Sequence, residues 1–572
     1  MGAGLNVDLL LGTQMELNGA QLLVEGMKLE EARCLFGTSA TATLPVLDVV
    51  YNTPQIKYIQ SQHEQGAIYM ANGHARATGK VSFCLVGPGP GTTNCQSGVA
   101  QAFNTFVPTI LIAIEDSTEY FGLGFSLHHG LDAVAVMKPV TKLSIRAERT
   151  SRLPDLMRMA ARLALSPRNG PAYLSVPRDL LDEKASLELV APEHYRIVGR
   201  PYESAAEVAR AVKILVEGKK PVAVAGGEVG WYGARQELVK LAELLAMPVA
   251  GAEGHKGVFP EDHPLSLGLI GLHGRSYAHR AFQEADVILA LGTSLTEFST
   301  GWFGHKVVPK NVKIIQIDVE PSEMGKIYPI EMGIAGNIKH VLESLTQQLG
   351  ERIKDPHYWK EVPRVKELQS QKRDWENSVS VHRNSAKSPI HPLRLMADLR
   401  DALPNDTLIV GQSGSTQAWF EYGFTGLTHN LGIGTWHPMG AEYCETLGAK
   451  LAMPDRTVVC LLGDGSMMMA LPEIATAVKY NIPVIAVVCH NDVFGKMHRT
   501  QIVNYGSRFI GTELPIPHLA NIAREFGAYS ERIIEPGQIM PAVRRSLDSG
   551  KPSLLEVMVD NSAECLAPPH LV

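Results

Sequence analysis

The stretch RTVVCLLGDGS, residues 456–466, joins an apolar run of strand length to a tight glycine turn. A second apolar run, PVIAVVCHND at 483–492, follows after one helix length and ends in polar residues. A strand, a turn, a helix and a further strand in this order form a βαβ unit, whose two strands lie parallel in one sheet. The segment therefore predicts an α/β fold with a parallel sheet.

The same alternation of apolar runs and amphipathic stretches recurs along all 572 residues, for example at 81–87, 220–228 and 286–294. A chain of this length is expected to form about three domains at roughly 100–200 residues each. Two polar connectors, 185–204 and 351–392, interrupt the alternation. We therefore place the predicted domains at 1–190, 200–345 and 385–560.

An internal repeat relates the first and third of these domains. Glycine turns at 89–91 and 463–465 each lead through a helical stretch to a strand that starts with proline. In both copies this proline lies eight residues before the polar residue that closes the strand, Asp116 or Asn491. The repeat predicts three doubly wound parallel-sheet domains, of which the first and third are related and the central one is distinct.

The amino-acid composition limits the kinds of partner that the protein is expected to bind. Lys+Arg 53 against Asp+Glu 59 gives a net charge of −6, which does not favour nucleic acid or an anionic membrane surface. The apolar runs are far shorter than the roughly 20 residues of a membrane helix. The N-terminus lacks the basic start of a secretory signal, and no C-x-x-C pair occurs among the seven cysteines. We expect a cytoplasmic protein with buried free thiols that acts on a small molecule.

The glycine turn after the strand at 457–462 has the chemistry of a phosphate site. A turn between a strand and a helix exposes backbone N–H groups, here those of Gly463, Gly465 and Ser466, to an anionic phosphate. Asp464 adds a carboxylate, and Asn491 ends the next strand at the same edge of the sheet. Carboxylate, amide and diphosphate oxygens together suit Mg²⁺.

The GDGS turn, the 24 residues after Gly465 and the closing Asn491 resemble the thiamine diphosphate motif. Over nearly its whole length the chain is similar to thiamine-diphosphate-dependent enzymes of the acetolactate synthase, pyruvate oxidase, benzoylformate decarboxylase and benzaldehyde lyase group. The resemblance implies a pyrimidine-binding first domain, a central domain without the catalytic centre and a diphosphate-binding third domain. It also implies active sites built between two subunits, hence a homodimer at least and, by family resemblance, a homotetramer.

The same resemblance implies the cofactor contacts. Thiamine diphosphate would be bound with Mg²⁺, and the metal would be held by Asp464, Asn491 and the carbonyl of Val493. Gly495 and Gln412 are further expected contacts of the cofactor. His490 departs from the pattern, because the family usually has a first Asn there. Since the second Asn supplies the ligand, the metal site should survive this change.

The segment QHEQGA at 62–67 resembles the activating-glutamate segment of the family. The thiazolium carbon is a weak acid, so a carboxylate is needed to tautomerise the aminopyrimidine before its nitrogen takes that proton. Glu64 is the candidate for this role. His63 could equally face the substrate or serve as a packing residue.

Two further segments resemble the family pocket. In MGAEYCETLGA at 439–449, Met439 corresponds to the apolar wedge that bends the cofactor into a V, and the bulky Trp436 and His437 precede it. Thr41 lies in a loop that contributes polar pocket residues in the decarboxylases. His128 and His129 occupy a segment that supplies a Gln in acetolactate synthase and benzaldehyde lyase. A neutral imidazole there can shuttle protons, and we favour His129, with the role of His128 left open.

Two positions argue against simple transfer of the synthase function. Phe298 stands where the synthase has an Arg near its second substrate, and Thr500 replaces the synthase's specificity Trp. We expect a lyase, carboligase or decarboxylase that makes or breaks a C–C bond beside the carbonyl of a 2-keto acid, acyloin or aldehyde. The alternatives are acetolactate-synthase-like condensation of 2-keto acids, a flavin-dependent 2-keto acid oxidase, and a catalytically silent homologue. FAD suits the central fold, but no residue requires it and we do not expect it.

Overall fold

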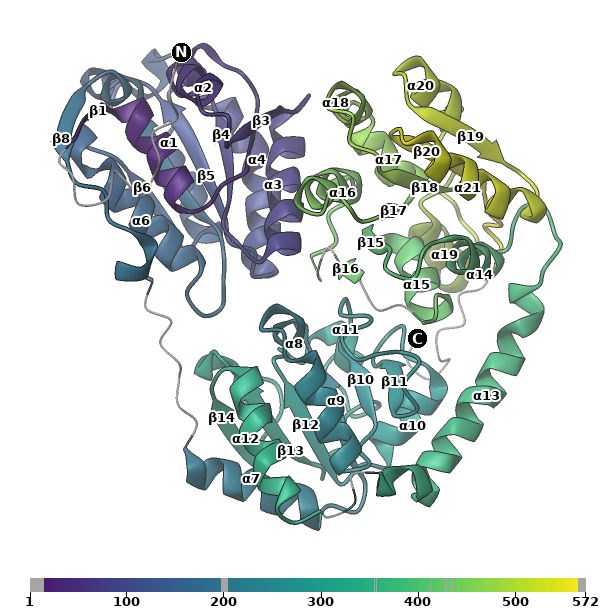
Figure 1. The fold of residues 1–572 in the computed structure, drawn as a ribbon. Coiled ribbons are helices and arrows are strands. Elements are labelled where there is room, and N and C mark those ends of the chain that lie inside the picture. The colour runs from purple at the N-terminus through teal and green to yellow at the C-terminus, as the bar shows by residue number, and fades with distance from the viewer. Residues whose placement is uncertain are drawn as a thin grey trace.

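The computed structural model describes residues 15–196, 204–353, 355, 357–411, 413–426, 430–432, 434 and 436–563. It contains three six-stranded sheets, each parallel throughout and covered by helices on both faces. The first and third domains lie side by side, with the central domain below both in Figure 1. The predicted α/β class with three doubly wound domains is confirmed.

The first domain has the strand order β3-β2-β4-β5-β7-β6. Its strands are β2 (Cys34–Gly37), β3 (Lys57–Gln60), β4 (Ser82–Val86), β5 (Thr109–Glu115), β6 (Leu143–Arg146) and β7 (Ala172–Pro177). One face is covered by α1 (Gly19–Leu29), α2 (Leu44–Tyr51) and α6 (Leu153–Ala164), and the other by α3 (Glu64–Thr78), α4 (Pro90–Asn104) and α5 (Ala133–Met137). A separate antiparallel ribbon pairs β1 (Met15–Asn18) with β8 (Lys184–Leu187).

The third domain has the order β16-β15-β17-β18-β20-β19. Its strands are β15 (Leu408–Gly411), β16 (Asn430–Gly432), β17 (Val458–Gly463), β18 (Ile485–His490), β19 (Tyr529–Ile533) and β20 (Ser553–Met558). Numbered along each domain, both this sheet and the first read 2-1-3-4-6-5, so the two share one topology. The helices are α14 (Pro392–Ala402), α15 (Gly414–Gly423), α16 (Ala441–Ala452), α17 (Asp464–Ala470), α18 (Glu473–Lys479), α19 (Gly495–Asn504), α20 (Leu519–Glu525) and α21 (Ile539–Ser549).

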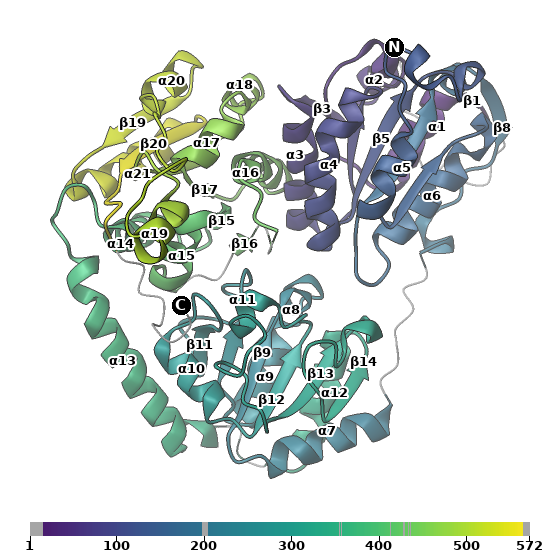
Figure 2. The same ribbon diagram turned by 180° about the vertical axis from the view of Figure 1, so that it is seen from behind.

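The central sheet differs, since its order β11-β10-β9-β12-β13-β14 reads 3-2-1-4-5-6, the order of dinucleotide-binding folds. Its strands are β9 (Pro221–Ala225), β10 (Val249–Gly251), β11 (Ser266–Leu269), β12 (Val287–Leu291), β13 (Lys313–Asp318) and β14 (Met332–Ala335). The helices are α7 (Ala205–Glu217), α8 (Gly227–Trp231), α9 (Arg235–Leu244), α10 (Ser276–Gln283), α11 (Glu297–Thr300) and α12 (Ile338–Gly350). The long helix α13 (Pro363–Arg383) then runs along the outer edge to the third domain (Figures 1 and 2).

Helices α3 and α16 join the first domain to the third, and both views show them side by side. Glycines let the two backbones meet: a Cβ on Gly73 would lie 2.1 Å from the Glu445 carbonyl oxygen, and one on Gly448 would lie 1.9 Å from that of Met70. The Arg76 guanidinium pairs with the Glu445 carboxylate beside this crossing. One apolar cluster runs through both domains here.

The Gly448→Ala variant is expected to lose about 1–3 kcal/mol of unfolding free energy, because the added methyl group forces α3 and α16 apart. Thermal unfolding followed by circular dichroism measures the loss. Gly350→Ala, at the end of α12, is the matched control, since its Cβ would meet nothing within 4 Å. Equal transition temperatures for the two variants would contradict this account of the crossing.

Two further predictions concern the fold as a whole. No helix in the described part of the chain has the length and apolarity that crossing a membrane requires. The six cysteines among the described residues are buried free thiols, as predicted, and Cys565 lies outside those residues.

Candidate functional site

A cavity of about 150 Å³ lies at the carboxyl ends of β17 and β18 in the third domain. Three helices begin on its wall: α15 at Gly414, α17 at Asp464 and α19 at Gly495. The first N–H groups of a helix have no partner within it, and the helix dipole places partial positive charge at this end. Three such ends around one cavity could hold an anionic group such as a diphosphate.

Asp464 lies at the centre of this arrangement and is almost fully buried. Its Oδ1 accepts a hydrogen bond from the N–H of Gly465 at 2.7 Å. Its Oδ2 accepts from the N–H groups of Asn491 at 2.9 Å and Asp492 at 2.8 Å. These contacts tie the turn after β17 to the end of β18 and bring the carboxylate and the Asn491 amide to one side of the cavity.

His490 occupies the position where the family usually has Asn, and a nitrogen of its buried ring lies within 4.8 Å of carboxylate oxygens of Asp464 and Asp492. Its Nδ1 lies 2.7 Å from the Glu556 carboxylate on β20, and its Nε2 lies 2.9 Å from that of Asp492. His490 is the last residue of β18 and does not line the cavity, whereas the next residue, Asn491, does. The departure from the family pattern therefore leaves the Asn491 amide at the cavity.

Glu442, on the first turn of α16, holds two residues of the cavity wall, Ser413 and Ser466. It is fully buried and accepts hydrogen bonds from the hydroxyl groups of Ser413 and Ser466 and from the N–H of Gly440. Burial raises the pKa of Glu442 despite these hydrogen bonds. The carboxylate thus joins the starts of α15 and α17 to the residue after Met439.

Most of the predicted cofactor residues line this one cavity: Met439, Gly463, Asp464, Gly465, Ser466, Asn491, Val493 and Gly495. Gln412 lies outside the described residues. The sequence analysis did not select several other lining residues, namely Ser413, Gly414, Ser415, Thr416, Trp419, Phe494 and Lys496. The small polar segment Ser413–Thr416, which begins two residues after the end of β15, was the sequence signal that could have pointed to the first four.

Glu64 lies on the first turn of α3, at the carboxyl edge of the first sheet. Its Oε1 accepts a hydrogen bond from the Thr38 hydroxyl at 2.8 Å, and its Oε2 accepts one from the Asn94 amide at 3.0 Å. Burial opposes ionisation, but these hydrogen bonds outweigh it and hold the pKa of Glu64 below its ordinary value. The carboxylate is therefore oriented and ionised at neutral pH.

Other candidates lie on the same edge of the first domain. His63 caps α3, because its Nδ1 accepts a hydrogen bond from the N–H of Gln65 at 3.1 Å. Thr41 is exposed at the turn before α2. The rings of His128 and His129 lie 4.0 Å apart, with His128 exposed and His129 half-buried.

None of these first-domain candidates is among the residues that line the cavity in the described part of the chain. Trp436 and His437, on the segment before Met439, do not line it either. Trp436 is about half exposed, and the His437 ring lies edge-on to Phe298 of the central domain. The single chain thus presents two separate groups of candidates, one on each of the related domains.

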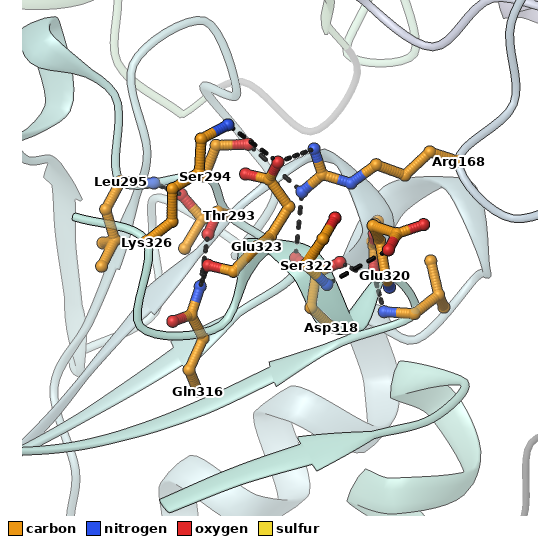
Figure 3. A network of polar contacts seen from close by, with 12 residues as sticks. Arg168, Thr293, Ser294, Leu295, Gln316, Asp318, Glu320, Ser322, Glu323 and Lys326 are labelled. Carbon is orange, nitrogen blue, oxygen red and sulfur yellow. Dashed lines mark hydrogen bonds and ion pairs between the residues drawn. The ribbon is translucent and has the colours of Figure 1, made fainter. Parts of the chain in front are cut away.

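Figure 3 shows a polar network where the first domain meets the carboxyl ends of the central strands. Arg168 of the first domain pairs with Asp318 at 3.2 Å and Glu323 at 3.3 Å. Its guanidinium also packs over the ring of Phe106, 4.6 Å from the ring centroid. The charge of Arg168 is therefore already balanced by two carboxylates of the protein.

Comparison with known proteins identifies the family. A probable acetolactate synthase large subunit of Methanocaldococcus jannaschii is 31% identical, over 95% of this chain and 92% of its own length. The chain belongs to the thiamine pyrophosphate enzymes, in the acetolactate synthase group. The family's N-terminal TPP binding, central and C-terminal TPP binding domains match residues 17–137, 208–345 and 410–557.

Two more relatives of this thiamine pyrophosphate enzyme cover almost the whole chain. A probable acetolactate synthase large subunit of Methanococcus aeolicus is 30% identical over 97% of this chain and 94% of its own length. A sulfoacetaldehyde acetyltransferase of Castellaniella defragrans is 29% identical over 95% of this chain and 93% of its own length. The family assignment supports thiamine diphosphate as the cofactor and C–C bond chemistry as the type of reaction.

Proposed function

We propose that this thiamine pyrophosphate enzyme is a Mg²⁺-dependent carboligase that joins the carbonyl carbon of a donor, such as a 2-keto acid, to a second carbonyl compound. The observation that carries the proposal is the convergence of three helix N-termini, Asp464 and Asn491 on one cavity. Carboxylate, amide and carbonyl oxygens are the donors that Mg²⁺ prefers, so this set fits a metal-bound diphosphate.

Each group has a role in the proposal. Asp464, Asn491 and the carbonyl of Val493 would hold Mg²⁺, and Met439 would support the bent cofactor. When bound, thiamine diphosphate supplies the carbon nucleophile that attacks the donor carbonyl. Glu64 would hold a proton at the pyrimidine nitrogen, which fits its fixed and ionised carboxylate.

Glu64 and the cavity belong to different domains, and we propose that each active site combines Glu64 of one subunit with the cavity of another. The functional unit is then a homodimer at least, with a homotetramer as the expected assembly. Two relatives are named large subunits, so a smaller partner subunit is a further candidate for this chain.

Product analysis tests the proposed reaction directly. The protein, loaded with thiamine diphosphate and Mg²⁺, is given a panel of 2-keto acids, acyloins and aldehydes, and the products are identified by mass spectrometry. A ligated hydroxyketone supports the carboligase. Release of an aldehyde alone would instead indicate a decarboxylase or lyase. The relative named sulfoacetaldehyde acetyltransferase favours a second candidate, acetyl transfer from a 2-sulfonated aldehyde whose sulfonate leaves as sulfite, which an acetylated acceptor together with released sulfite would reveal.

The His129→Ala variant is expected to lose roughly 10²–10⁴-fold in turnover, the usual contribution of a general acid or base. His129 is the better placed of the two histidines, because it is half-buried against the glycine turn that starts α4, the helix whose Asn94 holds Glu64. Steady-state kinetics measure the loss, with the exposed and remote His194→Ala as control. A loss below about tenfold would make His129 a packing residue and favour His128.

We do not expect the enzyme to require FAD. A flavin dinucleotide carries a diphosphate, yet Arg168 at the carboxyl edge of the central sheet is already paired with Asp318 and Glu323, and the neighbouring Lys326 also pairs with Glu323. Burial and the neighbouring Asp318 raise the pKa of Glu228 at the same edge to about 9, so acidic groups crowd this crevice. A colourless purified protein agrees with this proposal, whereas a yellow one with a flavin spectrum would contradict it.

A further inference from the structure

Lys496 is a cation at the cofactor cavity to which no role has yet been assigned. It is the second residue of α19 and lines the cavity beside Gly495 and Met497. Among the described residues, no carboxylate forms an ion pair with Lys496, whereas the buried Lys256, for example, pairs with Glu261. Its positive charge is therefore available to a bound molecule.

The ammonium group of Lys496 is held over the face of Phe298, with Nζ 5.5 Å from the ring centroid. This cation–π contact joins the third domain to α11 of the central domain. The Phe298 ring is in turn fixed by edge-on contacts with Trp302 and His437, each with ring centroids 6.1 Å apart. The contact aims the lysine without neutralising its charge.

The position of Lys496 over Phe298 bears on which acceptor the enzyme can bind. Phe298 stands where the resemblance leads us to expect an Arg near the second substrate, and the loss of a fixed cation would by itself weaken the binding of an anionic acceptor. In the structure, a cation from another element, α19, lies over the replacement residue. Positive charge is thus present at this place, supplied by a different domain.

We infer that Lys496 is a specificity-determining residue that binds the anionic group of the acceptor, a carboxylate or a sulfonate. This inference rests on the carboligase proposed above and names the acceptor class for the same site. An ammonium group is a point charge with three rotatable donors, so it can serve either anion. The aromatic rings of Phe298 and Trp302 offer an apolar surface to the remainder of the acceptor.

The test uses two aldehydes that differ only in a carboxylate, 4-formylbenzoate and benzaldehyde. Their affinities for the cofactor-loaded enzyme are measured by calorimetry, and both then compete as acceptors for one donor, pyruvate. A third acceptor, a sulfonated benzaldehyde, distinguishes carboxylate from sulfonate. We expect the anionic aldehyde to be preferred by roughly 10- to 100-fold, the usual effect of a hydrogen bond to a charged group.

Three variants identify the source of the preference. Lys496→Met is expected to reduce the ratio of anionic to neutral acceptor at least about tenfold, while Lys496→Arg keeps it. Lys360→Met is the matched control, because its Nζ also lies 5.5 Å from an aromatic centroid, that of Trp359, but does not line the cavity. Added salt should shrink the preference in the wild-type enzyme.

Equal affinities for the two aldehydes, or a preference that persists in Lys496→Met, would overturn the inference. A different outcome separates it from the proposed function. If the anionic aldehyde binds better through Lys496 but no ligated product forms with any acceptor, the carboligase proposal fails and the anion-binding role of Lys496 stands.

Discussion

The Glu64→Gln variant is expected to retain thiamine diphosphate and to slow exchange of the thiazolium C2 proton by roughly 10²–10⁴-fold. The amide has nearly the shape of the carboxylate, so the hydrogen bonds that hold the side chain can largely be kept. It cannot accept and return a proton at neutral pH. Exchange into deuterated water, followed by quenched-flow NMR, measures the chemical step separately from cofactor binding.

The geometry around Glu64 explains why this effect should be large. Thr38 follows β2 and Asn94 lies on α4, and both donate to the carboxylate from separate elements at the edge of the first sheet. Such preorganised contacts keep the group in one orientation, which is what proton transfer to a fixed nitrogen requires. Their effect on the pKa of Glu64 is to favour the ionised form.

The exposed Glu148, on the loop after β6, offers a control for the same substitution. Glu148→Gln should exchange the C2 proton at the wild-type rate. If Glu64→Gln did the same with cofactor fully bound, Glu64 would be only the residue that starts α3, and another group would have to activate the cofactor.

Much of the fold could be predicted because it depends on local patterns. Apolar strands that alternate with helices predict parallel sheets, and the spacing from Pro483 to Asn491 repeats that from Pro108 to Asp116. The structure assigns both stretches to the same place in two sheets of identical order, β5 and β18. The position of Asn491 beside Asp464 follows from the same rule, since the carboxyl ends of neighbouring parallel strands meet at one edge.

Contacts between distant segments could not be predicted in this way. Glu442 meets Ser413 and Ser466 only after three separate segments have folded, and no periodicity in the chain relates them. Lys496 is the strongest case, because its relation to Phe298 joins two domains across about two hundred residues of sequence. The sequence shows Phe298 where the family has an Arg. It does not show that the ammonium group of Lys496 lies over the Phe298 ring.

The Asp464→Ala variant is expected to lose Mg²⁺-dependent affinity for thiamine diphosphate by ~100-fold or more, because an ionised ligand of the metal is removed. The carboxylate also holds the N–H groups of Asn491 and Asp492, so its loss loosens the loop that carries the other proposed ligands. Calorimetry with and without Mg²⁺ measures the affinity. Wild-type, metal-independent binding would refute the assignment.

Asp464→Asn separates the two contributions in part, since its one oxygen can still accept the hydrogen bonds of the Asn491 and Asp492 N–H groups, while the bond from Gly465 and the charge are lost. It should bind the cofactor better than Asp464→Ala and more weakly than the wild type. Because a ligand that binds only the folded protein raises its melting temperature, cofactor and Mg²⁺ should stabilise the wild type and not the alanine variant. Similar melting temperatures without cofactor would show that both variants fold.

Mixing the two loss-of-function variants tests whether the sites are shared between subunits. Glu64→Gln and Asp464→Ala are each expected to be inactive as homodimers. If Glu64 serves the cavity of its partner, a hybrid of the two chains has one site in which both residues are intact, and random mixing by co-expression should restore about one quarter of wild-type activity. If Glu64 serves the cavity of its own chain, every site in the hybrid lacks one of the two residues, and no activity should return.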